Sequence, residues 1–365
     1  MKAVVAHGAA DFRLEDVPEP GLDGGALIAI AAAGVCAADR MIYAGTSPWE
    51  LSFPFTPGHE NAGTVLEIDA RSAARWGVDV GDLVVPEVMV PCGRCAMCRR
   101  ERFHLCRDGR HIGSSLHGGW AERMWLPPEA RVWRVPDGLA PEEAVVAEPL
   151  ACAIHAIERA DPGPDDALVI SGIGAIGAAA LAYVSAARPV RDVVALVTTP
   201  ERGAVARELG ASEAIDVRNS DAAAVLRDRF DGIGPDIYVD FSGQIESVDL
   251  GLEAIVPGGR LTLYGVYRRR ASVDWNTVAE FKELEIRGGH LAPTEFGTAL
   301  QLLATHAVDG RRLVTASYPL DEFQAALDEP RDGALMTLKT ILLPPRAAPA
   351  AGAAGSPATG EDDTR

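Results

Sequence analysis

The stretch that decides the fold is ALVISGIGAIGAAALAYVSAA, residues 167–187. A short apolar run at Leu168–Ser171 leads into a G-x-G-x-x-G turn, and an Ala-rich helix follows; the turn consists of Gly172, Ile173, Gly174, Ala175, Ile176 and Gly177. In this context the first two glycines allow a tight turn and close approach to a pyrophosphate, and the third lets helix and strand pack closely. The helix N-terminus offers N–H groups to the anion. The stretch predicts a dinucleotide-binding unit.

The same run from 167 to 187 has no charged residue and is long enough to cross a bilayer. Its many Gly, Ala and Ser residues make it weakly apolar, and no positively charged flank begins it. We therefore favour a strand and a helix buried inside an α/β domain.

Beyond this stretch the chain continues to alternate strand-like and helix-like segments. The expected strands are Leu168–Ser171, Val193–Val197, Asp236–Asp240 and Arg260–Gly265, and one helix begins near Pro200. Strands alternating with helices predict a doubly wound parallel sheet, which we place at 156–289.

The chain before this domain has a different texture. Short β-type runs broken by Gly and Pro predict a β-rich domain over 1–155; they are Ala26–Ala32, Gly63–Ile68, Leu83–Pro86 and Glu122–Leu126. Near its end, a Pro and two Glu at Pro141–Glu143 favour the start of one helix. We expect residues 290–345, which include the apolar run 338–344, to return to this first domain.

The tail 346–365 has no large apolar residue and is expected to be disordered.

The overall charge excludes some classes of partner. Across 365 residues, 34 Lys and Arg stand against 52 Asp and Glu, a formal net charge of −18. Such an acidic chain is a poor electrostatic match for the phosphate backbones of nucleic acids and for anionic lipid surfaces. We therefore expect no nucleic-acid or membrane partner. The N-terminus does not resemble a secretory signal, and we expect a cytoplasmic protein.

Four of the six cysteines form a compact cluster within 91–107. Their spacing is C-x2-C-x2-C-x7-C, at Cys92, Cys95, Cys98 and Cys106. Four thiolates so close together can enclose one Zn²⁺. Disulfides are the first alternative, but we expect no secretory signal and the remaining two cysteines are isolated. An iron–sulfur cluster is the second, but the ferredoxin run ends with a C-x3-C-P spacing. We predict a closed, structural zinc site that carries no chemistry.

A second metal site can be assembled from distant pieces of the chain. Cys36, His59, Glu60 and Glu148 offer sulfur, nitrogen and carboxylate oxygen donors, which suit a catalytic zinc with one open position. Asp39 could orient the imidazole of His59. Further along the helix of Glu148, we interpret Cys152 as a small buried residue, and His155 lies about 10 Å from Glu148 along the axis, too far to share its ion.

The second strand of the dinucleotide unit lacks the acid that usually holds the adenosine ribose. That strand ends at Val197, followed by Thr198, Thr199, Pro200, Glu201 and Arg202. Asp192 precedes the strand and therefore faces the other edge of the sheet. Without a carboxylate to repel a 2′-phosphate, and with Thr198 and Arg202 able to donate to one, we expect weak discrimination against NADP.

These motifs in this order resemble the zinc-dependent medium-chain alcohol dehydrogenase superfamily, most closely its polyol (sorbitol) and threonine dehydrogenase branch. The resemblance covers about residues 1–345 and rests on GVCAAD, GHE, the four-Cys lobe, EPLACAIHA and GIGAIG. It implies a GroES-like catalytic domain with an inserted Rossmann domain, zinc held by Cys36, His59 and Glu148, and Glu60 as a nearby or exchanging ligand. It also implies two zinc ions per chain, NAD or NADP, and a homodimer or homotetramer.

Two positions depart from the family pattern. The family commonly has Ser or Thr two residues after the ligand Cys and His five residues after it, and these relay the substrate's proton. Here they are Ala38 and Met41, which cannot carry a proton. The remaining candidates are Glu60, a zinc-bound water and Tyr43. A carboxylate beside zinc can act as a general base, although Glu60 could equally be a ligand or an outer partner. Trp49 and Trp120 could line the substrate pocket or pack in the core.

We interpret the chain as a zinc-dependent oxidoreductase that transfers a hydride between a secondary alcohol, of polyol, sugar or cyclitol type, and a nicotinamide cofactor. The zinc would act as Lewis acid on the hydroxyl. A zinc-independent type of carbonyl or enone reductase and a non-enzymatic nucleotide-binding sensor remain alternatives.

Overall fold

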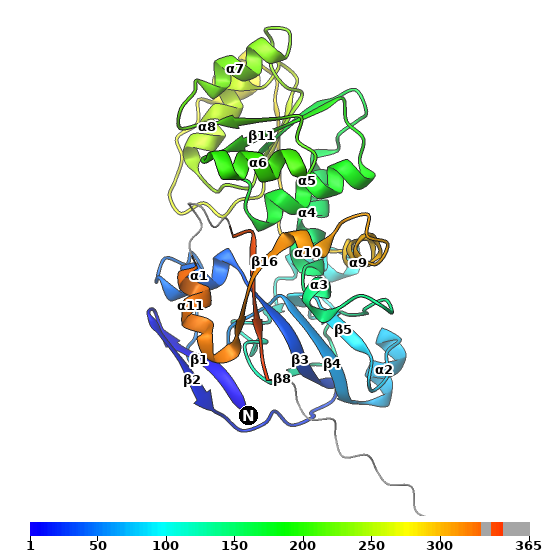
Figure 1. The fold of residues 1–365 in the computed structure, drawn as a ribbon. Helices are drawn as coiled ribbons and strands as arrows, with labels where there is room; N and C mark the ends of the chain where they lie inside the picture. Colours follow the sequence, from blue (N-terminus) through cyan, green and yellow to red (C-terminus); the bar gives the residue numbers. More distant parts are fainter. Residues whose placement is uncertain (330–336, 346–365) are drawn as a thin grey trace, which may run out of the picture.

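The computed structural model describes residues 1–329 and 337–345. Figure 1 shows two lobes, a parallel-sheet lobe in green and yellow above a β-rich lobe in blue and cyan. The tail 346–365, predicted to be disordered, lies outside the described residues.

The upper lobe is built on a six-stranded parallel sheet of order β12-β11-β10-β13-β14-β15. Its strands are β10 (Ala167–Ser171), β11 (Asp192–Val197), β12 (Glu213–Asp216), β13 (Ile237–Asp240), β14 (Arg260–Leu263) and β15 (Glu285–Gly288). Its helices are α5 (Ala175–Ala187), α6 (Pro200–Glu208), α7 (Ala222–Arg229) and α8 (Ile245–Ala254). The strand order reverses between β10 and β13, which is where doubly wound sheets bind their ligands. The predicted Rossmann domain is confirmed.

The stretch 167–187 forms β10, a turn and α5, and every residue of β10 is buried. Within 1–329 and 337–345, no helix is long and apolar enough to cross a membrane.

The lower lobe is built on a seven-stranded sheet in which β3 is central. Its order is β16-β17-β3-β4-β5-β9, and β8 also pairs with β3. Two small sheets, β1-β2 and β6-β7, lie outside this large one. The elements of the lobe up to residue 134 are β1 (Lys2–Gly8), β2 (Asp11–Asp16), β3 (Ala26–Val35), α1 (Ala37–Tyr43), β4 (Asn61–Ile68), α2 (Ala70–Trp76), β5 (Leu83–Pro86), β6 (Met89–Val90), β7 (Arg110–His111), β8 (Arg123–Leu126) and β9 (Val132–Arg134). The antiparallel β3–β4 ladder brings the ends of two candidate ligand segments together.

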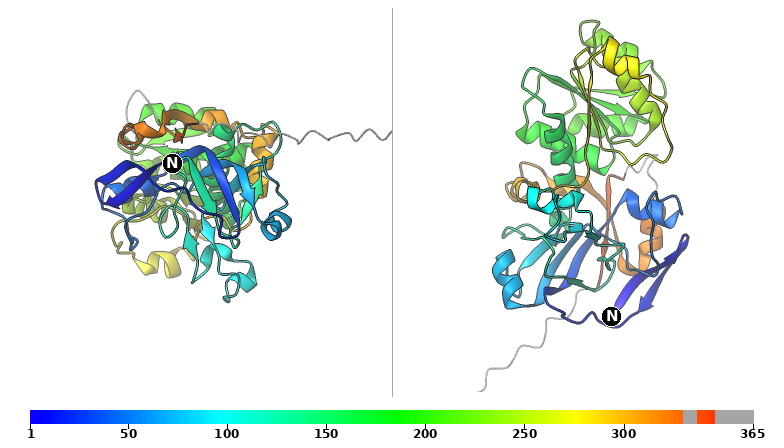
Figure 2. Two further views of the ribbon diagram at one scale, coloured as in Figure 1. Left: turned by 90° about the horizontal axis from the view of Figure 1, so that it is seen from below. Right: turned by 180° about the vertical axis from the view of Figure 1, so that it is seen from behind.

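After β15 the chain returns to the lower lobe. It forms α9 (Phe296–Ala304), α10 (Gly310–Leu313), β16 (Val314–Pro319), α11 (Phe323–Asp328) and β17 (Lys339–Leu343). β17 pairs antiparallel with β3, with Thr340 opposite Val35. Figures 1 and 2 show this orange-to-red segment beside the blue N-terminal strands. The domain boundaries at 155/156 and 289/290 stay predictions.

The helix expected from Pro141 is two helices, α3 (Pro141–Ala144) and α4 (Ala147–Ala160). The reason is Pro149, which in one continuous helix would clash with the carbonyl of Val145 and remove a hydrogen bond. Restarting at Ala147 puts Pro149 in the first turn, where its missing N–H costs nothing. The buried α4 belongs to a core shared with α5 and α9, between the two lobes, and its first turn carries Glu148.

Candidate metal and cofactor site

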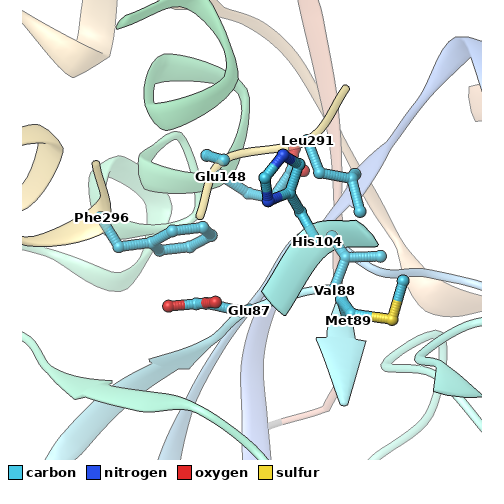
Figure 3. A pocket seen from close by; sticks show the side chains of 8 residues that line it. Glu87, Val88, Met89, His104, Glu148, Leu291 and Phe296 are labelled. Carbon is cyan, nitrogen blue, oxygen red and sulfur yellow. The ribbon is translucent and has the colours of Figure 1, made fainter. Parts of the chain in front are cut away.

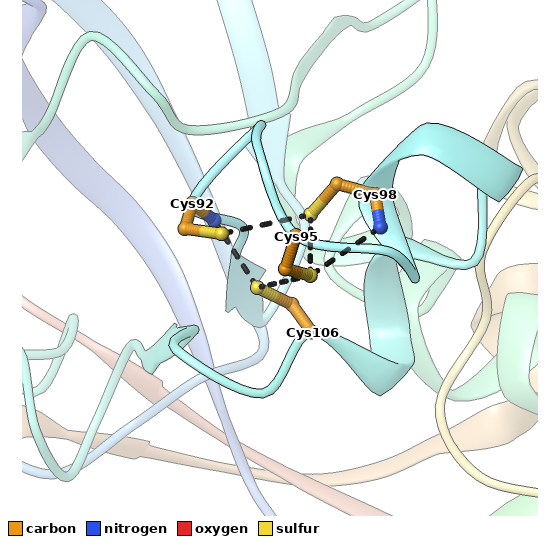
Figure 4. Close-up of side chains that lie close together, drawn as sticks. All are labelled: Cys92, Cys95, Cys98 and Cys106. Atoms are coloured by element: carbon orange, nitrogen blue, oxygen red, sulfur yellow. Dashed lines mark hydrogen bonds between the residues drawn. The ribbon is translucent and has the colours of Figure 1, made fainter.

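The four clustered cysteines converge as their spacing predicts (Figure 4). Their Sγ atoms all lie within 4.8 Å of one another. The Sγ of Cys95 is 3.5 Å from that of Cys98 and 3.8 Å from that of Cys106, and Cys92 and Cys98 are 4.0 Å apart. A disulfide would require about 2.05 Å, whereas Zn–S bonds of about 2.3 Å give a tetrahedron with edges of about 3.8 Å. The four thiols therefore have the spacing of a tetrahedral metal site.

The backbone around the four clustered cysteines favours the thiolate form of Cys95. The N–H of Cys98 donates to the Sγ of Cys95, and this contact lowers the pKa of Cys95 to about 6. Cys98 is more deeply buried, and desolvation raises its pKa. A bound cation would oppose that effect, because metal ligation deprotonates thiols.

A second group of ligands lies where β3 ends and β4 begins. The ligand atoms of Cys36, His59 and Glu60 lie within 4.8 Å of one another. Cys36 is the N-cap of α1, directly after β3, and His59 and Glu60 directly precede β4. One S, one N and one O donor suit Zn²⁺.

Asp39 lies beside His59, as the sequence predicts. It is fully buried, its Oδ2 accepts from the backbone N–H of Cys36 at 2.8 Å, and its Oδ1 is 3.8 Å from His59 Nδ1. The distance from Oδ1 to Nδ1 is longer than a hydrogen bond, and Oδ1 has no hydrogen-bond partner among the described residues. Burial by itself lowers the pKa of His59, but the charges of Asp39 and Cys36 outweigh it and raise that pKa well above its usual range. Nδ1 faces Asp39, so Nε2 is available to a metal.

Lys339 forms a buried ion pair with Glu60. Its Nζ is 2.6 Å from both Glu60 carboxylate oxygens, and both side chains are almost completely buried. Burial favours the neutral amine, but the charge of Glu60 outweighs it and raises the pKa of Lys339. The Glu60 carboxylate is thus already paired with a buried cation through both of its oxygens.

Glu148 lies near this group without joining its close trio. It is buried in the first turn of α4, and its Oε1 accepts from the Cys152 thiol at 3.3 Å. Burial and the charge of Glu60 raise the pKa of Glu148 to about 7. His155, two turns further along, instead contacts Glu295, with 3.0 Å from Nδ1 to Oε1.

A small cavity of about 10 Å³ lies beside Glu148, enough for about one water molecule (Figure 3). Glu87, His104 and Phe296 also line it. Burial lowers the pKa of His104 to about 4, and the pKa of Glu87 is raised by burial although Arg131 lies 2.8 Å away. The cavity combines an apolar wall with polar groups.

The candidates for pocket walls and proton transfer have different surroundings. Trp120 is completely buried, whereas Trp49 is 45% exposed. Tyr43 is partly buried and packs edge-on against Phe12, with ring centroids 5.1 Å apart, at the side of the core of the β-rich lobe. Tyr43 is therefore occupied in packing.

The glycine turn has the geometry that its motif predicts. Gly172 has φ +90°, and an added Cβ there would collide with Ser242, in the loop that follows β13. Gly174 is the N-cap of α5, and a Cβ there would enter open space. A Cβ on Gly177 would lie 2.1 Å from the Gly172 carbonyl oxygen. The turn is thus tight at both ends and open in the middle, and it fits a pyrophosphate over the start of α5.

The end of β11 lies beside this turn. Thr199 caps α6 by accepting from the Arg202 N–H at 3.3 Å, and the Arg202 guanidinium donates to the carbonyl of Ile173. Asp192 opens β11 at the opposite edge, where it pairs with Arg229 at 2.8 Å. Arg202 is therefore a polar side chain that reaches the turn, and Thr198 directly follows the end of β11.

Sequence reasoning missed Lys339. The signal was present, because a Lys inside the apolar run 338–344 stands out in a strand expected to be buried. Its partner could not be named without knowing that β17 returns beside β3.

Comparisons with known proteins agree with this arrangement. Residues 22–137 match the family model of the alcohol dehydrogenase GroES-like domain, and residues 175–305 match that of zinc-binding dehydrogenases. The erythritol/L-threitol dehydrogenase of Mycolicibacterium smegmatis is 36% identical over 94% of this chain and 98% of its own length. The L-threonine 3-dehydrogenase of Pyrococcus abyssi is 33% identical over 91% of this chain and 95% of its own.

Among solved structures, a Sinorhizobium meliloti protein assigned as a zinc-binding dehydrogenase and bound to NADP superposes with a TM-score of 0.85. It is 26% identical and covers 94% of this chain and 99% of its own. By fold, by motif order and by these relatives, the chain belongs to the zinc-dependent medium-chain alcohol dehydrogenase superfamily, in its branch of polyol and threonine dehydrogenases.

Proposed function

We propose that this protein is a zinc-dependent dehydrogenase that transfers a hydride between a secondary alcohol and NAD or NADP. The observation that carries the proposal is the close group of Cys36, His59 and Glu60 in a chain that also holds an open glycine turn at the switch point of a parallel sheet. A polyol, sugar or cyclitol is the proposed substrate class, because the relatives include an erythritol/L-threitol dehydrogenase and a sorbitol dehydrogenase.

The proposed ligands of the catalytic zinc are Cys36, His59 and Glu148, with Glu60 as a nearby or exchanging ligand. When bound, zinc supplies Lewis-acid chemistry that lowers the pKa of an alcohol hydroxyl. Asp39 accepts a hydrogen bond from the backbone N–H of Cys36, and its charge lies 3.8 Å from Nδ1 of His59, where it favours a proton on Nδ1 and leaves Nε2 for the metal.

Glu60 is the proposed acceptor of the alcohol proton, since Ala38 and Met41 cannot relay it and Tyr43 is packed against Phe12. The Lys339 ammonium holds both of its oxygens, so a proton that reaches Glu60 must replace one of these contacts. Lys339 then keeps the other oxygen in place.

The cofactor is proposed to lie over the glycine turn, bound by Gly172, Ile173, Gly174, Ala175, Ile176 and Gly177. NADP should be used at least as well as NAD, because β11 ends without an acid and Arg202 reaches the turn. Cys92, Cys95, Cys98 and Cys106 would hold a second, structural zinc.

We also propose that two copies associate through β15. This strand lies at the edge of its sheet, Ile286 on it is exposed, and Trp275 and Phe281, which precede it in the chain, are exposed as well. An antiparallel pairing of β15 with its own copy would satisfy the unpaired edge and give a closed dimer. Light scattering should give twice the mass of the chain, and Ile286→Asp should halve it, whereas Ile233→Asp, another exposed Ile, should not. A monomeric wild type would contradict the proposal.

A cytoplasmic location is proposed because none of the six cysteines forms a disulfide and five of them are proposed zinc ligands, which must stay reduced.

The function is tested by turnover. Purified protein is assayed with a panel of tetritols, hexitols and cyclitols, with L-threonine and with simple enones, each with NAD and NADP. We expect zinc-dependent oxidation of at least one polyol. Turnover of enones alone by protein with one zinc per chain would favour a zinc-independent reductase, and absence of any turnover would favour a sensor.

A further inference from the structure

Trp120 contacts the backbone next to both Cys36 and His59. Its side chain is completely buried, and its indole Nε1–H donates to the carbonyl oxygen of Gly34 at 3.0 Å. Gly34 lies two residues before Cys36. The same ring covers Gly58, directly before His59, so closely that a Cβ there would lie 2.2 Å from Cδ1 of Trp120.

The segment around Trp120 also holds the loop that carries His59. The backbone N–H groups of Gly118, Gly119 and Trp120 donate to the carbonyls of Thr56, Gly58 and Pro57 at 2.7, 3.0 and 3.0 Å. A Cβ on Gly119 would lie 2.0 Å from Oδ1 of Asn61, the first residue of β4. The loop 56–61 is therefore hydrogen-bonded to residues 118–120 at Thr56–Gly58 and packs closely against Gly119 at Asn61.

The β3–β4 ladder alone does not fix the two ligands relative to each other. Its last registered pair is Ala33 with Asn61, and Cys36, His59 and Glu60 lie beyond it. Past that point one backbone bond continues, from Gly34 N–H to the Glu60 carbonyl at 2.7 Å. Gly34 is thus held between Glu60 on one side and the Trp120 indole on the other.

We propose that Trp120 is a positioning residue of the metal site: by binding Gly34 and covering Gly58, it sets the separation between the Cys36 thiolate and the His59 imidazole. This inference rests on the proposed function. Metal ligands must be held within about 0.5 Å of their productive geometry, and outer partners that hold them typically contribute 10–100-fold in metal affinity.

The test compares two tryptophans that make the same kind of bond. Trp120→Phe removes the indole N–H and part of the ring. Trp125→Phe is the matched control, because Trp125 Nε1 donates to another glycine carbonyl, that of Gly24, at 2.8 Å and away from the ligands. Both variants and the wild type are prepared as full-length zinc and cobalt proteins. The readouts are the visible cobalt absorption bands and the rate at which a chelator removes zinc. Cys36→Ser, treated alike, provides the reference that isolates the bands of the Cys36 site.

We expect Trp120→Phe to shift the cobalt bands of the Cys36 site and to speed the loss of its metal at least about tenfold. Trp125→Phe should have the cobalt bands and the rate of metal loss of the wild type. This should hold even if the two variants have the same Tm and that Tm is lower than in the wild type. Wild-type bands and rate in Trp120→Phe would overturn the inference. If the Phe variant does not fold, 3-benzothienylalanine at positions 120 and 125, which keeps the ring shape but has no N–H, replaces it. Identical cobalt spectra for wild type and Cys36→Ser would instead refute the proposed function.

Discussion

Replacing Lys339 by Met tests the buried ion pair beside the metal site. The Lys339 and Glu60 side chains are 4% and 2% exposed, and Nζ is 2.6 Å from both carboxylate oxygens. Removing one partner of such a pair leaves a buried charge without compensation and costs about 3–5 kcal/mol. With an unfolding entropy of about 2.1 cal/mol/K per residue over 365 residues, the expected loss in Tm is about 4–7 °C for metal-free protein.

The assay is thermal unfolding of the metal-free and zinc-loaded proteins. Zinc should reduce the loss in Lys339→Met, because a cation beside Glu60 compensates its charge. The control is Lys339→Met combined with Glu60→Gln, which removes both charges and should recover part of the stability. The reasoning is refuted if metal-free Lys339→Met melts within 1 °C of wild type, or if the double variant is no more stable than Lys339→Met.

Three further predictions follow from other parts of the chain. Cys95→Ser should remove one zinc per chain and lower the Tm, because a structural zinc contributes directly to folding; unchanged metal content and Tm with lost turnover would show that these cysteines have another role. For the cofactor, kcat/KM with NADP should at least equal that with NAD, and Arg202→Ala should raise KM for NADP more than for NAD, since the guanidinium lies at the glycine turn; a preference for NAD above a hundredfold would contradict this. His104 has a pKa of about 4 in the folded chain against an ordinary 6.5, so the unfolded chain binds its proton first and stability should fall as the pH drops from 6.5 toward 4. Discounted for partial exposure, His104 should contribute about 1 kcal/mol to this loss. His104→Gln should therefore lose less stability between pH 7 and pH 5 than wild type. Equal losses in the two proteins would exclude His104 as a source of the pH dependence.

Local chemistry made much of the fold predictable. The glycines at 172, 174 and 177 require a turn between strand and helix, and the structure has that turn. The alternation of apolar runs identified β10, β11, β13 and β14 to within a few residues. The four-Cys spacing predicted a cluster, and the cluster forms because its members are close in the chain.

Features that depend on distant pairing were less accessible. The convergence of Cys36 with His59 could be proposed from donor types, but it depends on the β3–β4 register and on the contacts of Trp120 beyond the last registered pair, which the sequence does not specify locally. The ion pair of Lys339 with Glu60 requires β17 to return beside β3. The break between α3 and α4 was readable from Pro149, since a proline in a helix interior removes a hydrogen bond, but the helix-start signal at Pro141–Glu143 favoured one helix.

The central claim is that Cys36 holds a catalytic zinc separate from the four-Cys site. The most direct measurement is zinc per chain, by atomic emission on dialysed protein, in wild type and in Cys36→Ser. The account predicts two zinc ions in wild type and one in Cys36→Ser, with the Tm reduced far less than by Cys95→Ser and polyol oxidation abolished. One zinc in both proteins, or wild-type turnover by Cys36→Ser, would contradict it.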